Sequence, residues 1–480
     1  MTMHRIPLSR DPERELRDRP QTSRLIFAWF AHVHWLLLTA LLATTCLVSI
    51  RAQSPAPQPQ VSEAVSNELG KLRELTEAKS YAPALALINR LLGAAPAESY
   101  DRTLLSQIKA QIFLTEGRYA EAIAPLEDAL RLGERLNHLP ETTQRESLFL
   151  LAQLYQQQAS ESKDPVRQRT LLAQSVACLR RWQTRTPKPT PEGQLFAASL
   201  LYQQATLDPD HPDTRTLLEA RGAAEEGLVL QIKPPTALYV LILASLQQRE
   251  EHAQAADLLE LLVEKSPSTL GYWQQLTATY LALASSAKNE RDADRYNLRA
   301  LLALERAQAR GFLNSPKENF NRVALLLALR QFEPAIALLE KGLAEGTLEN
   351  TRRNWELLAS TCQQIQREPQ AIAALEKAVK VLPDDGQLEF TLAQLLYART
   401  RIADARAHLE LAVKKGGLDK PGQTRLFLAY TAYELQDYEA ALHQARDAAA
   451  FDDVKKDDLA RLVKAIADAR RARPESVSKT

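Results

Sequence analysis

Apolar residues recur at spacings of three and four positions from about residue 64 to residue 451, and the segments between these runs carry Pro or Gly. This spacing puts apolar side chains on one face of an α-helix, whereas a half-buried strand needs strict alternation. The pattern therefore predicts short amphipathic helices joined by corners. Because glycine accounts for only 15 of the 480 residues, we expect few turns that need a positive φ.

The helical pattern repeats with a period of about 34 residues. Frames that begin at Arg352 and Gly386 place apolar residues at the same offsets in both of their helices. The matching pairs are Leu358 and Leu392, Ala359 and Ala393, Cys362 and Leu396, Ala371 and Ala405, Leu375 and Leu409, and Ala378 and Ala412. Small residues let two helices cross closely, and large residues such as Trp355 fill the spaces around the crossing.

Ten helix pairs of this kind follow one another along the chain. They lie near 64–96, 99–134, 145–187, 192–234, 235–267, 270–311, 316–347, 352–385, 386–417 and 422–453, with extra residues between the helices of the third, fourth and sixth pairs. A single pair leaves one apolar face in water, so its stability comes from stacking on its neighbours. The segment from Lys456 to Ala472 is amphipathic and is predicted to cap the last pair.

The residue types at these offsets resemble the tetratricopeptide repeat. The matching residues are Trp273, Leu276, Thr277 and Tyr280 in one pair, Leu148, Leu151, Ala152 and Tyr155 in another, and the segment GRYAEAIAPLEDAL in a third. The resemblance implies an all-α fold, a right-handed α-solenoid of about ten repeats over 64–453. A capping helix over 454–472 and a disordered tail over 473–480 complete the predicted organisation.

An export signal is predicted before the repeats. Residues 25–50 contain no Lys, Arg, Asp or Glu and are long enough to cross a bilayer. The preceding leader, 1–24, is rich in Arg, which keeps it in the cytoplasm and sends the rest outward. Two fates are open for 25–52: a signal peptide cleaved after Ala52, or an uncleaved signal anchor in the inner membrane. A Pro- and Gln-rich tether over 53–63 follows, and we expect the repeats to be periplasmic.

Charge and cysteine content narrow the range of partners. The 60 Lys and Arg residues balance 59 Asp and Glu residues, so the formal net charge is +1. A nucleic-acid-binding surface needs a basic surplus, and we expect no nucleic-acid partner. Cys178 and Cys362 are the only cysteines after the export segment. Two cysteines are too few for a disulfide framework, and both are expected to be passive apolar residues.

No segment matches a phosphate-binding glycine loop, a zinc-protease helix, a Cys pair at metal-ligand spacing or a nucleophile elbow. The densest cluster of acids and histidine is Asp208, Asp210, His211 and Asp213. Its spacing faintly resembles a calcium-binding loop, but Pro212 occupies the position of a ligand and Asp213 that of the glycine at the sharp turn. We therefore expect no enzyme, no cofactor, no metal and no small-molecule substrate. An enzyme that uses this loop is the alternative.

The resemblance implies that certain positions of each first helix face a concave groove, namely the second, fifth, ninth and twelfth. From these positions in the last three repeats, we predict the following partner-binding residues: Arg353, Glu356, Gln363, Phe390, Gln394, Tyr397, Leu426, Tyr430 and Tyr433. Exposed aromatic and amide groups suit a peptide or a helix of a partner protein. The alternative is that Phe390, Tyr430 and Tyr433 only pack inside a tight superhelix.

Residues 235–452 resemble a narrower family: periplasmic tetratricopeptide proteins encoded beside TonB, ExbB and ExbD energy-transduction systems. The phrases that carry this resemblance are YWQQLTATYLAL, LEKGLAEGTLENTRRNWELLAS and VKKGGLDKPGQTRLFLAYTAYELQDYEAA. It implies a non-catalytic periplasmic adaptor that binds TonB-, ExbB- or ExbD-like proteins, with membrane contact through the N-terminal segment if that segment is uncleaved. The alternative is a scaffold for another envelope assembly, such as outer-membrane or polysaccharide export machinery.

Overall fold

The computed structural model describes residues 60–472, so the predicted leader, export segment and C-terminal tail lie outside the described residues. This part of the chain folds into 21 α-helices, and the all-α prediction is confirmed for it. The helices are α3 Glu63–Glu77, α4 Tyr81–Ala94, α5 Tyr100–Thr115, α6 Tyr119–Leu136, α7 Glu141–Glu161, α8 Pro165–Arg185, α9 Pro191–Ala205, α10 Thr214–Val229, α11 Thr236–Gln248, α12 His252–Lys265, α13 Leu270–Ser285, α14 Glu290–Gln308, α15 Pro316–Ala328, α16 Phe332–Glu345, α17 Arg352–Gln364, α18 Glu368–Val381, α19 Gly386–Ala398, α20 Ile402–Lys415, α21 Pro421–Glu434, α22 Tyr438–Ala448 and α23 Lys456–Ala472. None of these helices has the length and apolar character that a membrane span needs.

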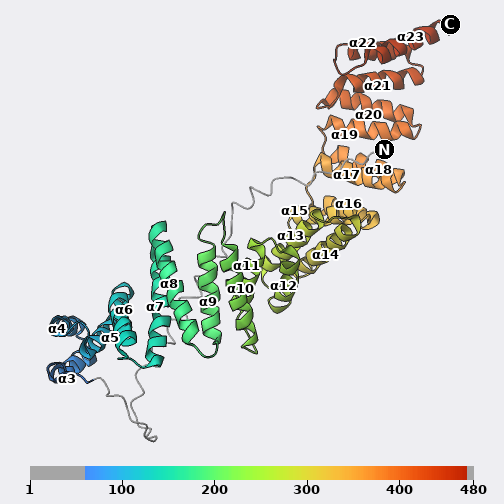
Figure 1. Cartoon of the computed structure of the whole chain (residues 1–480). Helices are drawn as coiled ribbons and strands as arrows, with labels where there is room; N and C mark the ends of the chain where they lie inside the picture. Colours follow the sequence, from blue (N-terminus) through green and yellow to red (C-terminus); the bar gives the residue numbers. More distant parts are fainter. Residues whose placement is uncertain (1–59, 473–480) are drawn as a thin grey trace. The chain divides into compact units, whose positions relative to one another are not determined.

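The chain divides into two compact units, one up to Glu251 and one from His252 onward. Inside each unit, helices that follow one another in sequence lie side by side, as Figure 1 shows for α5 with α6 and for α19 with α20. Packing is therefore local in sequence, as in other helical-repeat arrays. The boundary between the units falls inside the predicted repeat 235–267, between its two helices.

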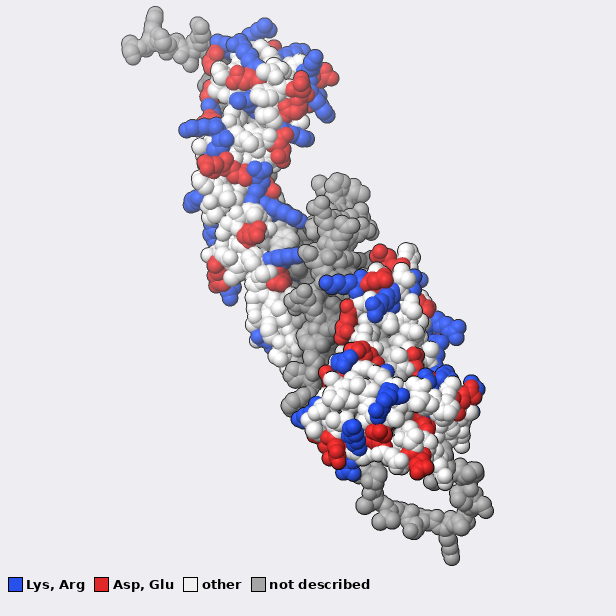
Figure 2. All heavy atoms as spheres, turned by 90° about the vertical axis from the view of Figure 1, so that its left-hand side faces the viewer, with Lys and Arg blue, Asp and Glu red and all other residues white. Residues whose placement is uncertain are grey.

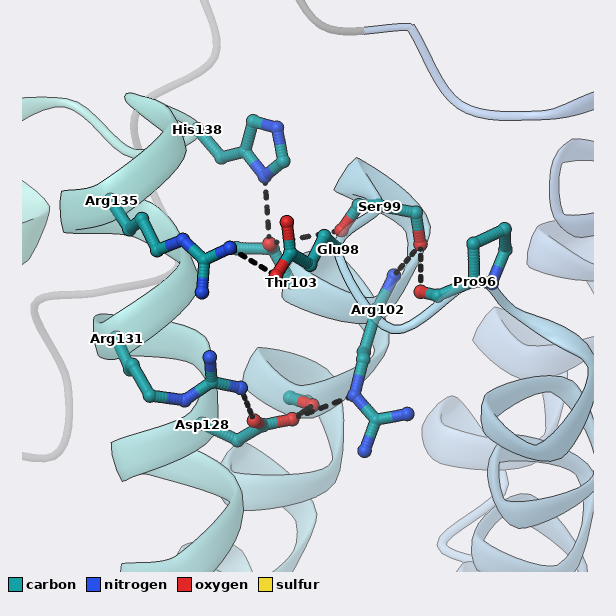
Figure 3. A network of polar contacts seen from close by, with 10 residues as sticks. Pro96, Glu98, Ser99, Arg102, Thr103, Asp128, Arg131, Arg135 and His138 are labelled. Carbon is teal, nitrogen blue, oxygen red and sulfur yellow. Dashed lines mark hydrogen bonds and ion pairs between the residues drawn. The ribbon is translucent and has the colours of Figure 1, made fainter.

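Many of these helices begin with a residue whose side chain caps the first turn. Figure 3 shows one such cap at the start of α5, beside the contacts that link α5 to α6. The hydroxyl of Ser99 accepts a hydrogen bond from the backbone N–H of Arg102 at 3.2 Å, which satisfies one of the free N–H groups of α5. The Arg102 guanidinium then donates to Asp128 of α6 at 3.1 Å, and Asp128 also pairs with Arg131. Burial alone would raise the pKa of Asp128, but the bonds from Arg131 and Arg102 outweigh it and hold this pKa below its usual value.

Many corners between the two helices of a pair use a residue with positive φ, so the expectation of few such turns was wrong. Among residues 60–472, eight residues other than glycine have φ between 53° and 61°, including Lys79, Glu250, Arg330, Gln366, Thr400 and Gln436. After Gln366, the backbone N–H of Arg367 bonds back to the carbonyl of Cys362 at 2.8 Å. This bond satisfies a free carbonyl at the end of α17 and helps to offset the cost of the left-handed conformation at Gln366, which is not a glycine.

Part of the extra sequence in three repeats lengthens helices. Helices α7 and α8 have 21 residues each and α14 has 19, compared with 13 in α17. The stretch 206–213, in contrast, remains outside helices. At its end Asp213 caps α10, because its carboxylate accepts from the backbone N–H of Arg215 at 3.1 Å.

Residues at the repeat signature positions form the core. Trp273 and Leu276 are completely buried in α13, and Tyr280 is 1% exposed. The small residues Ala359 and Ala371 are buried in α17 and α18, as close helix crossings require. In the first unit, Leu148, Leu151 and Tyr155 are buried at the same positions of α7, so each unit consists of paired helices of the tetratricopeptide type.

Close packing against the backbone requires a glycine at position 386. A Cβ atom on Gly386, the first residue of α19, would lie 2.2 Å from the carbonyl oxygen of Gly416 and 2.7 Å from that of Ala412. Backbone atoms cannot move aside cheaply, so we expect Gly386→Ala to lower the free energy of unfolding by about 2 kcal/mol. Urea denaturation followed by circular dichroism would measure the loss.

Gly271 provides the matched control, because it also lies in the first turn of a helix and an added Cβ would meet no atom within 4 Å. Gly271→Ala should stabilise the protein by about 0.5 kcal/mol, since alanine loses less backbone entropy on folding. Equal effects of the two substitutions would contradict the close packing at Gly386.

Candidate protein-binding surface

Three aromatic rings from two neighbouring first helices meet on one surface of the second unit. Phe390 and Tyr397 are seven residues apart on α19 and therefore share one face of that helix. The Phe427 ring of α21 lies edge-on to both, with ring centroids 6.3 Å from Phe390 and 5.0 Å from Tyr397. All three are only partly buried, and they pack against the core. We call these three residues the aromatic face.

A carboxylate borders the aromatic face on α21. The Tyr397 hydroxyl donates a hydrogen bond of 2.5 Å to Glu434, which is otherwise exposed. This hydrogen bond, together with burial, raises the pKa of Tyr397 to about 12. The tyrosine therefore stays neutral near pH 7, and the bond fixes the position of its ring.

A second carboxylate borders the aromatic face on α17. Glu356 is half-buried and accepts a long hydrogen bond of 3.4 Å from Thr391, the residue after Phe390. The Thr391 hydroxyl also bonds the carbonyl of Gln387 at 3.0 Å, so its single proton is shared. Burial raises the pKa of Glu356 above its usual value, although the charge of Arg352 opposes the shift.

The cations closest to Glu356 in sequence are directed elsewhere. Arg352 pairs with Asp385 through a contact of 2.7 Å. The guanidinium of Arg353 lies over the Phe320 ring of α15, with 5.5 Å between the guanidinium carbon and the ring centroid. Among residues 60–472, no Lys, Arg or His forms an ion pair with Glu356.

The predicted partner-binding residues differ in their exposure to solvent. Arg353, Gln363 and Gln394 are exposed. Glu356 on α17, and Phe390 and Tyr397 on α19, are partly exposed. Leu426 is buried, with 9% of its surface exposed, so its assignment to a binding surface needs correction: it belongs to the core of the last repeat. Tyr430 and Tyr433 pack partly exposed against the same core.

Phe427, Phe320 and Glu434 are not among the residues predicted from the sequence. Phe320 stands at the fifth position of its helix, so the same offsets extended to α15 would have found it. Phe427 and Glu434 each stand one position after an offset used for the groove. Their role depends on how far α21 is rotated relative to α19, for which the sequence offers no signal.

The acid and histidine loop before α10 has a structural role. The His211 ring lies 3.3 Å from Asp208 and is strongly exposed, while Asp213 caps the helix. Within the part of the chain that the structure describes, no group of three or more His, Cys, Asp or Glu side chains is placed to hold a metal ion. Cys178 and Cys362 are buried and free.

Lys and Arg are intermingled with Asp and Glu on the face shown in Figure 2. A cleft of about 650 Å³ in the second unit has among its lining residues Arg291, Asp292, Asp294 and Arg295 of α14. A second cleft of about 530 Å³ in the first unit is lined in part by Phe149 and Trp182. Neither cleft includes a residue of the aromatic face.

Comparisons with known proteins yield structural neighbours only. No protein-family model and no curated protein matches the chain. A thermophilic TPR protein of Thermus thermophilus is 24% identical over 43% of this chain and all of its own, with a TM-score of 0.23. PilF of Pseudomonas aeruginosa is 17% identical over 52% of this chain and 99% of its own, with a TM-score of 0.28. YrrB, a TPR protein with an unusual peptide-binding site, is 14% identical over 45% of this chain and 100% of its own, with a TM-score of 0.29.

These TM-scores are low, and the tetratricopeptide-type fold is recognised from the helix pairs of this chain. Stacked helix pairs present a long surface from consecutive repeats, and arrays of this kind generally bind other proteins without chemistry of their own. The aromatic face, with a carboxylate on each side, is the strongest candidate for such a surface among the described residues.

Proposed function

We propose that this chain is a non-catalytic scaffold of the bacterial cell envelope that binds a partner protein across the first helices α17, α19 and α21. One observation carries the proposal: three partly exposed aromatic rings from two repeats form a single surface beside the exposed amide of Gln394. Aromatic rings give large contact areas at low conformational cost, and they dominate the energy of many protein interfaces.

The surface is held rigid before any partner binds. The Phe427 ring contacts rings of the preceding repeat, and the Tyr397 hydroxyl is bonded to Glu434 of α21. A partner therefore loses little entropy in ordering these side chains, which increases the affinity that a given contact area provides.

The specific role that we propose is that of a periplasmic adaptor in a TonB-type energy-transduction complex with ExbB- and ExbD-like proteins. The phrases that resemble such adaptors supply α17 and α21, the helices on either side of α19. One phrase contains Gly416 and Gly417, whose φ values of 74° and 65° favour glycine. Export by the N-terminal segment, as a cleaved signal peptide or an inner-membrane anchor, would bring the repeats to the periplasm.

The experiment is cross-linking of the full chain in its own cells, followed by purification and identification of the bound proteins. Gln394 lies one turn from both Phe390 and Tyr397, so Gln394→Arg places bulk and charge at the centre of the surface. We expect this variant to lose the cross-linked partner while the free energy of unfolding changes by less than about 0.5 kcal/mol, because the side chain is exposed.

Gln370→Arg is the matched control, since Gln370 is an exposed glutamine on α18, the second helix of its pair. It should retain the partner. Recovery of ExbB-, ExbD- or TonB-like proteins would support the specific role, and recovery of outer-membrane or polysaccharide export proteins alone would replace it with the alternative assembly. Equal cross-linking by both variants would contradict binding at the aromatic face.

A further inference from the structure

Glu356 is a carboxylate whose charge the folded chain leaves largely uncompensated. It is half-buried, its one hydrogen bond comes from a hydroxyl at 3.4 Å, and Asp385 and Asp419 lie close enough to add to the negative potential around it. The nearby positive charge, Arg352, is held by Asp385 at 2.7 Å. A half-buried carboxylate with so little compensation is costly in the free protein and attracts a cation.

The aromatic face begins next to this carboxylate. Thr391, which contacts Glu356, follows Phe390 in α19, and the Phe390 ring contacts Phe427. An extended segment or helix that lies across α17, α19 and α21 therefore meets a negative charge first and aromatic rings next. Glu434 also accepts one hydroxyl, that of Tyr397, but it is exposed and its charge is hydrated, whereas the half-buried Glu356 gains more from a cation.

We propose that the partner segment carries a Lys or Arg that pairs with Glu356 and, close to it in space, an aromatic side chain that packs on Phe390, Tyr397 and Phe427. This inference rests on the proposed function and specifies the chemistry of its partner. The pair would form in a partly desolvated site, where a charge-assisted hydrogen bond is stronger than on an open surface. Burial raises the pKa of Glu356 even though the charge of Arg352 lowers it, which is consistent with a carboxylate that forms no ion pair within residues 60–472.

The test uses labelled peptides that are capped at both ends and contain one Arg and one Trp in a Gly- and Ser-rich background, with the separation of the two varied. Binding to the full chain is measured by fluorescence anisotropy. At least one spacing should bind, and replacing its Arg by Glu or its Trp by Ala should each weaken binding about tenfold or more. Added salt should weaken the Arg-dependent part of the affinity.

The variant Glu356→Gln keeps the size of the side chain and removes its charge. We expect it to weaken binding of the Arg–Trp peptide about tenfold and not to weaken the residual binding of the Glu–Trp peptide, because the substitution removes a repulsion between like charges. Glu345→Gln, at an exposed glutamate of α16, is the control and should not change either affinity. Thermal unfolding of both variants verifies that they are folded.

Three results would overturn the inference: no binding by any Arg–Trp peptide, equal binding by the Glu–Trp peptide, or an unchanged affinity in Glu356→Gln. The cross-linking experiment separates this outcome from failure of the scaffold itself. If Gln394→Arg removes the cellular partner while Glu356→Gln leaves peptide binding unchanged, the scaffold stands and the basic partner segment is wrong.

Discussion

Trp273→Ala should lower the free energy of unfolding by about 3 to 5 kcal/mol, the largest effect that we expect from a single substitution. The Trp273 side chain is fully buried in α13, and its indole N–H donates to the carbonyl of Pro267 at 2.9 Å. Removing it leaves a large cavity and an unpaired carbonyl. The guanidinium groups of Arg306 and Arg310, about 5 Å from the ring centroid, would also lose their aromatic contact.

Repeat arrays can unfold in parts, so the loss is best measured by urea denaturation together with hydrogen exchange of the amides in α13 and α14. A comparison of two conservative variants isolates the hydrogen bond. The indole N–H of Trp355 is buried without a hydrogen-bond partner in residues 60–472. Trp273→Phe should therefore cost about 1 kcal/mol more than Trp355→Phe. A greater loss at Trp355 would show that the bond to Pro267 contributes little.

Glu389→Ala should lower the free energy of unfolding by about 3 kcal/mol, because it removes the acid at the centre of a buried charge cluster. Glu389 is 2% exposed. One carboxylate oxygen lies 2.6 Å from the ammonium of Lys415, and the other lies 2.5 Å from Nδ1 of His408. Without the carboxylate, Lys415 and His408 must move toward water or remain unpaired. Urea denaturation at pH 7 would measure the loss.

An exposed ion pair on the same helix as Lys415 provides the control. Glu410 is 54% exposed and pairs with Arg406 on the surface of α20. Glu410→Ala should cost less than about 1 kcal/mol, since surface pairs gain little over their hydrated charges. If Glu389→Ala costs no more than Glu410→Ala, the buried cluster does not contribute to stability.

The contrast between Glu389 and Glu356 shows how one array can separate stability from binding. Both are glutamates of first helices with restricted exposure. Glu389 receives two nitrogen groups from α20, whereas Glu356 receives only a shared hydroxyl from α19. A carboxylate with a nitrogen partner on each oxygen is costly to remove, and one without such partners is available to a binding protein.

The sequence by itself determined the secondary structure, the pairing of the helices and most of the core. Trp273, Leu276 and Tyr280 are buried as the repeat signature predicts, and α23 spans Lys456 to Ala472 as its amphipathic pattern indicates. This is possible because each helix packs mainly on its neighbours in sequence, so a local pattern carries most of the information about contacts.

Only the tertiary structure decided which residues form the surface. Leu426 is buried and Phe427 joins the rings of α19, although the offsets selected Leu426. Position in a helix specifies the face on which a side chain lies, but the rotation of that face relative to the next helix depends on how both sets of side chains interlock. The uncompensated charge of Glu356 has the same origin, because it depends on Asp385 drawing Arg352 away.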